Sequence, residues 1–179
     1  MHVHPFALDL RTIHNLTHHC APRFTTFFRP HFPIIGPISL NNIYHSSPFL
    51  FWTIIILVSS RVQEEPGSLY SRIRDPYDRL LKTEALAAPL PLSKIQALLY
   101  LCMWPLPCEV QTQDPSWLYC GIALNSALYM GLHRARPMPS MRCMSVASGS
   151  AQARANTWLG CFYVSASYVF FILDHHFPV

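Results

Sequence analysis

The sequence predicts an all-α protein, an irregular multi-helix bundle, from three observations. Apolar side chains recur on a helical period in residues 93–104. Residues 114–131 open with an Asp-Pro pair and close with a glycine, which are common helix boundaries. Residues 49–58 form an apolar run whose length suits a buried helix. With 51% hydrophobic residues among 179, the chain can bury one sizeable core.

The N-terminal segment, residues 1–23, carries five of the ten histidines and matches no pattern that we can assign. We expect an unassigned, poorly ordered leader there, with the helical domain beginning at residue 24. The triplet His18-His19-Cys20 offers metal-ligating atoms. A solvated tail is the preferred interpretation, because no supporting carboxylate or outer-shell partner accompanies the triplet.

The apolar run at residues 49–58 raises the question of a membrane span. A spanning helix needs about 20 apolar residues, whereas Pro48 precedes this run and Ser59-Ser60-Arg61 follows it. A buried core helix therefore fits better, although the β-branched residues would also allow a strand.

A short amphipathic helix is expected in residues 70–81. Its apolar face consists of Ile73, Tyr77, Leu80 and Leu81. Pro76 suggests that the helix begins near Asp75, because a residue before proline is pushed away from the α conformation. Residues 86–92, which contain two prolines, are expected to form a loop.

The helix at residues 93–104 has sequence signals at both ends. Ser93 and Gln96 form a capping box, in which each side chain can satisfy a backbone donor at the helix start. Pro105 ends the helix, because proline lacks the amide hydrogen that continuation needs. Trp104 is expected to pack between helices rather than to line an aromatic effector cage.

The next helix should begin with Asp114 as its N-cap, with Pro115 at the first helical position. It should run to about Met130, and Gly131 should be the left-handed residue just past its end.

Three further side chains belong to this helix pair. We expect Trp117 to pack between helices, as Trp104 does. For His133 and Arg134 we favour capping of the last helical carbonyls over a polar wall for a ligand, because local geometry alone makes the capping available.

The C-terminal part of the chain is expected to contain a flexible loop, residues 137–150, and a helix from about Ala151 to Phe171. Residues 171–179 are expected to form an irregular tail. The helical domain therefore spans residues 24–170. Its abrupt end and the low share of charged residues, 12%, indicate a partial domain that is truncated at the C-terminus.

Motifs for catalysis, metals and nucleic acids are missing from the sequence. It contains no phosphate-binding loop, dinucleotide fingerprint, nucleophile elbow or His-Glu-x-x-His motif, so we assign no catalytic or cofactor-binding residue and expect no enzyme. The six cysteines lack the paired spacing of a zinc site, and we expect reduced core thiols and no metal. The net charge of +4 is dispersed and forms no basic stripe.

Five blocks of the sequence match, in the same order, motifs of a known protein family. They are residues 28–35, 47–61, 95–107, 114–134 and 154–162. Together, and in this order, they resemble the regulatory middle-homology domain of fungal binuclear zinc-cluster transcription factors. The residues that carry the family's motifs, in structural roles, are Gln96, Trp104, Pro105, Asp114, Trp117, Gly131, His133, Arg134 and Trp158.

This resemblance implies a nuclear domain that regulates transcription by RNA polymerase II. Zinc is expected only in the family's six-cysteine DNA-binding module, which these residues do not contain, so the chain alone should not bind DNA specifically. The resemblance leaves protein partners, a dimer or a small-molecule effector open as binding partners, and implies no membrane.

Two alternatives to this function remain open at the level of sequence. The high hydrophobicity would also suit a membrane-associated protein that uses residues 49–58 and the C-terminal aromatic residues. The chain could also be a nonfunctional fragment of a regulator. A cooperative thermal transition is expected only if a true core forms.

Overall fold

The computed structural model describes residues 10–37, 40–61, 68–88, 90–110, 113–134 and 149–176. Within these ranges it contains helices and no strand, so the predicted all-α class is confirmed. In chain order the elements are α1 (Leu10–Arg23), the π-helical turn η1 (Phe24–Phe28), α2 (Leu40–Ser46), α3 (Pro48–Arg61), α4 (Leu69–Ala85), α5 (Leu92–Met103), α6 (Ser116–Tyr129) and α8 (Ala151–His176).

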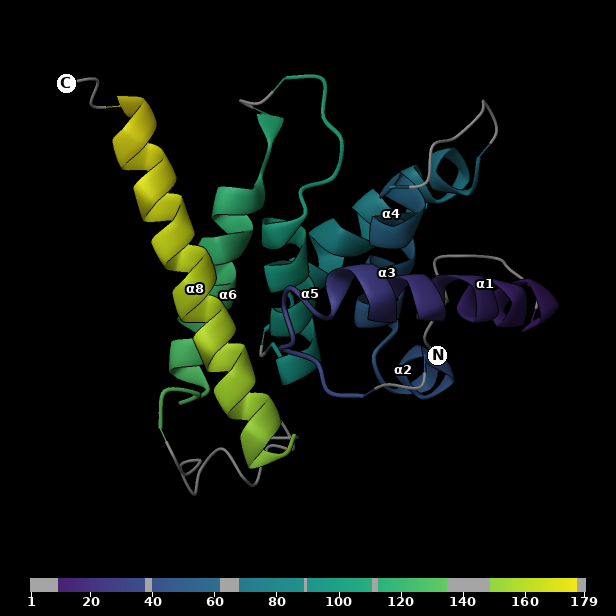
Figure 1. The fold of residues 1–179 in the computed structure, drawn as a ribbon, viewed down its shortest axis with the longest axis horizontal. Helices are drawn as coiled ribbons and strands as arrows, with labels where there is room; N and C mark the ends of the chain where they lie inside the picture. The colour runs from purple at the N-terminus through teal and green to yellow at the C-terminus, as the bar shows by residue number, and fades with distance from the viewer. Residues whose placement is uncertain are drawn as a thin grey trace.

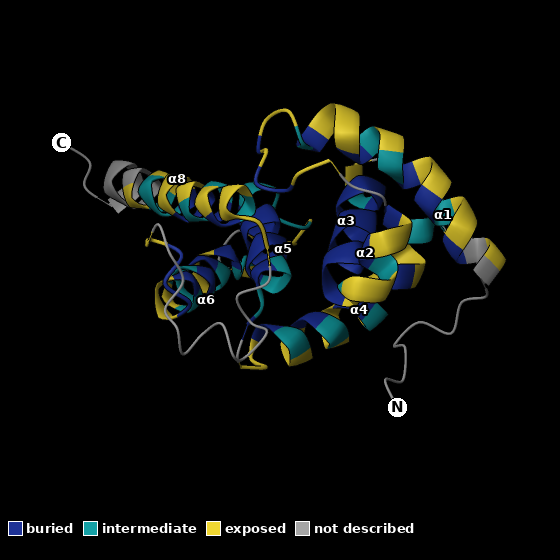
Figure 2. Cartoon of the chain, turned by 90° about the horizontal axis from the view of Figure 1, so that it is seen from below, coloured by how far each residue is buried: buried dark blue, intermediate teal, exposed yellow. Residues whose placement is uncertain are grey.

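Helix α5 lies in the middle of the molecule, between two groups of helices (Figure 1). On one side it packs on α3, which in turn contacts α1, α2 and α4. On the other side it packs against α6 and α8. A perpendicular view shows the same order, with α3 and α5 coloured as buried (Figure 2). The bundle is therefore irregular, and α5 belongs to both groups.

Helix α3 is the apolar run, and all of its residues from Phe49 to Ser59 are buried. It is a core helix, as expected, because neighbouring helices cover every face of it. Its one buried threonine is satisfied: Thr53 Oγ1 donates to the Phe49 carbonyl at 2.8 Å and lies 2.8 Å from the Tyr77 hydroxyl of α4. Among the described residues, no helix has the length and hydropathy that crossing a membrane requires.

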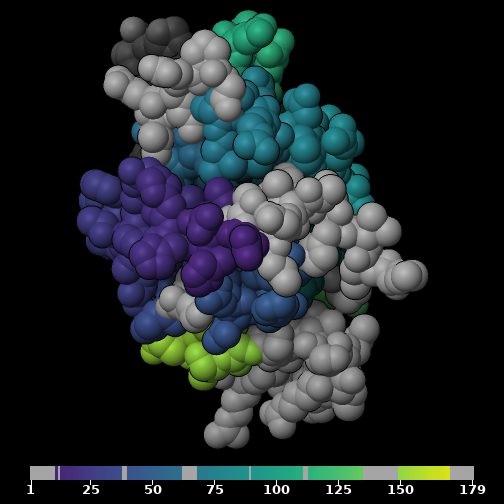
Figure 3. All heavy atoms as spheres, turned by 90° about the vertical axis from the view of Figure 1, so that its right-hand side faces the viewer, coloured from purple at the N-terminus to yellow at the C-terminus, as the bar shows by residue number. Residues whose placement is uncertain are grey.

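Helix α1 corrects the expectation of an unassigned leader up to residue 23. From Leu10 onward the chain is helical, while residues 1–9 lie outside the described ranges. Ile13, Thr17 and Cys20 are buried, and their spacing puts them on one face of the helix. Figure 3 shows α1 in purple lying over this side of the molecule, between α4 in teal and α2 in blue.

Helix α4 begins earlier than the position of Pro76 suggests. It starts at Leu69, where Ser68 Oγ accepts a hydrogen bond from the Ser71 amide at 3.4 Å, and it continues through Pro76. Burial on one face compensates for the backbone hydrogen bond that proline cannot donate. The predicted apolar face is confirmed by burial of Ile73, Tyr77 and Leu81.

Helix α5 lacks the predicted capping box. It begins at Leu92, with Pro91 at the N-cap position and no side-chain cap. The Gln96 side chain bonds instead to groups outside its own helix, because it points into the protein interior, where those groups need a donor.

Helix α6 begins at Ser116, one residue later than expected, because Pro115 rather than Asp114 takes the N-cap position. Asp114 precedes the N-cap, and its Oδ1 accepts a hydrogen bond from the Ser116 amide at 3.0 Å. Helix α8 extends to His176, so residues 171–176 are helical rather than an irregular tail. Of the expected loop at residues 137–150, positions 137–148 lie outside the described ranges.

Candidate functional site

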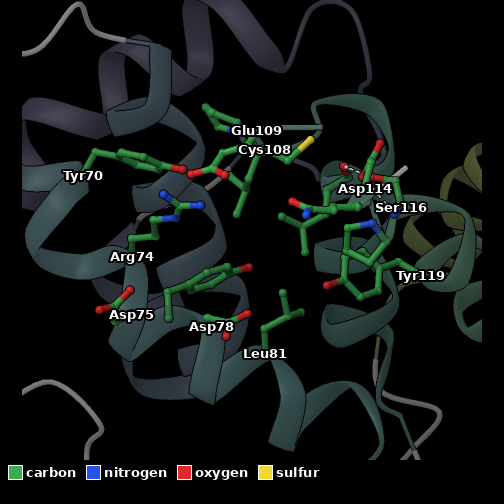
Figure 4. A pocket seen from close by; sticks show the side chains of 16 residues that line it. Tyr70, Arg74, Asp75, Asp78, Leu81, Cys108, Glu109, Asp114, Ser116 and Tyr119 are labelled. Carbon is green, nitrogen blue, oxygen red and sulfur yellow. Dashed lines mark hydrogen bonds between the residues drawn. The ribbon is translucent and has the colours of Figure 1, made fainter. Parts of the chain in front are cut away.

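A polar pocket of about 500 Å³ lies between α4, the loop after α5 and the start of α6 (Figure 4). Helix α4 lines it with Tyr70, Arg74 and Asp78, among others, the loop with Cys108 and Glu109, and α6 with Tyr119. Its volume falls in the range of sites for small molecules. It also opens where α4, from one group of helices, faces α6, from the other.

Two carboxylates of the polar pocket have partners close to them in the sequence. Asp78 Oδ2 forms an ion pair with Lys82 Nζ at 2.6 Å, one helical turn away. Asp114 Oδ1 accepts hydrogen bonds from the amide and the hydroxyl of Ser116 at the start of α6. Figure 4 shows the side chains of Arg74 and Glu109 reaching toward each other.

The hydroxyl of Tyr119 in the polar pocket has a raised pKa. Burial raises the pKa of its hydroxyl to about 12, and the negative charges of Asp78 and Asp114 add to the effect. The hydroxyl therefore stays protonated near neutral pH and can donate to a polar ligand. In the described part of the chain, no group of three or more His, Cys, Asp or Glu side chains is placed to hold a metal ion.

A buried polar junction joins α5 and α8 to the segment that follows η1. Gln96 Nε2 donates to the Ile34 carbonyl at 3.1 Å and to Thr157 Oγ1 at 3.0 Å. Tyr100 donates its hydroxyl to the Phe32 carbonyl at 2.7 Å. These bonds connect residues more than 60 positions apart in the sequence, so they fix the relative position of the three segments.

The end of α6 forms the glycine cap that the sequence predicts. Gly131 has φ +64°, its amide donates to the Leu128 carbonyl at 3.0 Å, and the amide of Leu132 donates to the Ala127 carbonyl at 2.9 Å. This pair of bonds is a Schellman motif. The guanidinium that reaches a carbonyl here belongs to Arg154, whose Nη2 donates to the Gly131 carbonyl at 3.1 Å.

His133 and Arg134 are exposed and lie beside this cap. The His133 ring packs on Trp158 of α8, with ring centroids 5.7 Å apart, and Arg134 Nε donates to His133 Nε2 at 3.2 Å. The two side chains therefore connect the end of α6 to α8. The expected capping by them is not what the structure records: the carbonyls of Ala127 and Leu128 accept from the backbone amides of Leu132 and Gly131.

The two tryptophans of the helix pair do not share a site. Trp104 is half-buried and packs on Phe28 and Tyr100, which fits interhelix packing. Trp117 is 62% exposed, so its expected place in the core is wrong. It lies on the outer face of α6, because Ser116 and Cys120 take the buried positions. Pro105 is half-buried, and its carbonyl accepts from Arg61 Nη2 at 3.5 Å.

Four of the described cysteines are buried and free, as expected, while Cys108 is exposed. Burial raises the pKa of Cys20 to about 11 and that of Cys161 to about 12. It also raises the pKa of Cys102 and Cys120. These thiols are therefore poor nucleophiles near neutral pH.

Sequence reasoning missed the α4 side of the polar pocket. Arg74, Asp75 and Asp78 lie on the polar face of an amphipathic helix, and such a face usually indicates solvent. It also missed Tyr100 and Thr157, because a buried hydroxyl inside an apolar helix leaves no local pattern.

The fold and the polar pocket define a class of protein: a helical domain held together by buried hydrogen bonds, with a pocket between its two groups of helices. Comparison with known proteins identifies the family. Residues 22–169 match the model of the fungal specific transcription factor domain. The chain belongs to this family.

The relatives are transcription factors. The chain is 34% identical over 142 residues to the putative transcription factor SEF1 of Kluyveromyces lactis, which covers 78% of this chain and 12% of the relative. It is 33% identical over 145 residues to the transcriptional regulatory protein SEF1 of Candida albicans, covering 79% and 16%. The putative transcription factor SEF1 of Saccharomyces cerevisiae is 31% identical over 151 residues, covering 83% and 13%. The chain thus spans less than a fifth of these relatives. No solved structure matches the chain.

Proposed function

We propose that this chain is the regulatory domain of a nuclear transcription factor that controls transcription by RNA polymerase II. The observation that carries the proposal is the family match, which runs from the end of α1 into α8 and so includes both groups of helices. The domain acts through what it binds rather than through catalysis.

We further propose that these residues do not contact DNA specifically. The 179 residues contain no six-cysteine cluster, and their net charge of +4 is dispersed. Specific recognition of DNA needs side chains on base edges and a basic surface that positions them. The zinc-cluster module of the family would supply both.

The regulatory mechanism follows from the position of α5. A ligand or partner changes the balance between two conformations only if it binds one of them more tightly. The polar pocket has walls from α4 and α6, on opposite sides of α5. A polar effector in this pocket would therefore favour one arrangement of the two helix groups over another.

A reporter assay tests the regulatory role. The 179 residues are inserted between a heterologous DNA-binding module and an activation segment, and reporter output is compared with that of the same fusion carrying a flexible linker instead. We expect the domain to change output several-fold. Equal output from the two fusions would contradict the proposal.

Fluorescence anisotropy tests the claim about DNA. Purified chain is titrated into labelled duplexes of specific and scrambled sequence at physiological salt, because non-specific binding depends steeply on salt. Similar and weak binding to both duplexes is expected. Tight, sequence-selective binding would overturn this part of the proposal.

A further inference from the structure

A second cavity, of about 350 Å³, has a chemistry opposite to that of the polar pocket. Its lining residues are Arg23, Phe27, Phe28, Val58, Arg61 and Trp104. They come from the end of α1, the turn η1, the last two turns of α3 and the C-cap of α5. We call it the aromatic cavity. Three separate segments of the sequence therefore meet in it.

The apolar wall of the aromatic cavity is held in place by packed rings. Trp104 stacks on Tyr100 with centroids 5.6 Å apart and meets Phe28 edge-on at 5.0 Å. Such contacts restrict the orientation of the indole. Phe27, by contrast, is 65% exposed at the rim. The wall is preorganised, and an apolar surface at its edge still faces solvent.

The two arginines of the aromatic cavity have no acidic partner among the described residues. Arg23 Nη1 contacts His19 Nε2, and Arg61 Nη2 donates to the Pro105 carbonyl at 3.5 Å. The ion pairs in the described part of the chain join Lys82 to Asp78 and Lys94 to Glu84. Two positive charges therefore lie beside an apolar wall without a described carboxylate to neutralise them.

Helix ends alone do not account for this arrangement. Arg23 and Arg61 each lie in the last turn of a helix, where a cation interacts favourably with the dipole. That interaction needs neither a shared cavity nor an aromatic wall. Guanidinium groups bind carboxylates through charge-assisted, often bidentate hydrogen bonds.

We propose that the aromatic cavity binds a small amphipathic carboxylate with an aromatic or branched apolar body. Arg23 and Arg61 hold the carboxylate, and the apolar body lies against Trp104, Val58 and Phe27. The volume is at the lower end of the range for small-molecule sites, which fits a compact ligand. The proposal concerns binding and does not depend on the regulatory function proposed above.

Three probes with one body and different head groups test the charge requirement. Isothermal titration calorimetry of the purified chain is carried out with 3-phenylpropionate, 3-phenyl-1-propanol and 3-phenylpropylamine. We expect saturable binding of the carboxylate and at least about tenfold weaker binding of the alcohol, since a charge-assisted hydrogen bond differs from a neutral one by roughly 1–2 kcal/mol. The amine should not bind. Equal affinity for carboxylate and alcohol, or no saturable binding of the carboxylate, would overturn the proposal.

Variants then locate the site. Arg61→Gln and Arg23→Gln should each weaken 3-phenylpropionate binding about tenfold, and Phe27→Ala should weaken it while leaving the preference for carboxylate over alcohol. The matched control is Arg79→Gln, which removes an exposed arginine of α4 outside the cavity. Unchanged affinity in both arginine variants, or an equal loss in the control, would place binding elsewhere and reject this site. Circular dichroism confirms that each variant is folded.

Discussion

At the residue scale, Gln96 shows how one side chain connects distant parts of the fold. It is 6% exposed, and its amide reaches both the backbone of the segment after η1 and a hydroxyl of α8. A buried carbonyl that loses its donor costs roughly 1–3 kcal/mol. Gln96 should therefore matter more to stability than its place in an apolar helix suggests.

The substitution Gln96→Met tests this role, because methionine keeps the length of the side chain and removes the donor. We expect the free energy of unfolding to fall by about 2 kcal/mol, measured by urea denaturation. Gln113→Met is the control at an exposed position and should change the value by less than about 0.5 kcal/mol. Equal stability of wild type and Gln96→Met would show that the Ile34 carbonyl has another donor.

Residues differ in how far the sequence reveals their roles. The role of Gly131 was predictable, because the left-handed residue past a helix end is commonly glycine. The role of Gln96 was not. The Ser-x-x-Gln pattern indicated a local cap, whereas the partners of Gln96 lie 61 and 62 positions away in the chain.

At the element scale, α5 and α6 were predictable from apolar residues and boundary residues, whereas the apolar run of α3 would also have allowed a strand and only the family resemblance favoured a helix. The segment that forms α1 was not predictable, because its buried face combines Ile13 with Thr17 and Cys20 while histidines cover its exposed face. The start of α4 was hidden by Pro76. In both cases tertiary packing stabilises a helix that local sequence describes poorly.

Two glycines, one inside α6 and one just past its end, give a matched test of helix-end geometry. Gly131 has φ +64°, a conformation that costs other residues about 1–2 kcal/mol. Gly121 lies inside α6 with open space around a would-be Cβ. Gly131→Ala should therefore lower the free energy of unfolding by about 1 kcal/mol, and Gly121→Ala should raise it by about 0.5–1 kcal/mol. Urea denaturation measures both. Changes of the same sign would contradict the cap assignment.

At the scale of the whole molecule, the packing is dense around α3 and α5 and open on the outer faces of α6 and α8. Apolar side chains are exposed there. The largest are Trp117, Tyr129, Leu159, Phe162 and Tyr163. Stability therefore depends on packing in the interior. The thiols and tyrosine hydroxyls that are buried there are protonated near neutral pH.

The buried thiols of this interior predict that alkaline pH lowers the stability of the protein. Burial raises the pKa of Cys20 to about 11 and that of Cys161 to about 12. Below about pH 9, near the ordinary value for a thiol, both the folded and the unfolded state keep these protons. Above it the unfolded state loses them first and binds fewer protons than the folded state, so the free energy of unfolding falls as pH rises.

Thermal melts should show a constant Tm at pH 7–8 and a decline from about pH 9 to pH 11. Cys161→Ala should make that decline shallower, whereas Cys108→Ala, at an exposed thiol, should leave its slope unchanged. A Tm that is flat to pH 11 would show that these thiols ionise equally in both states.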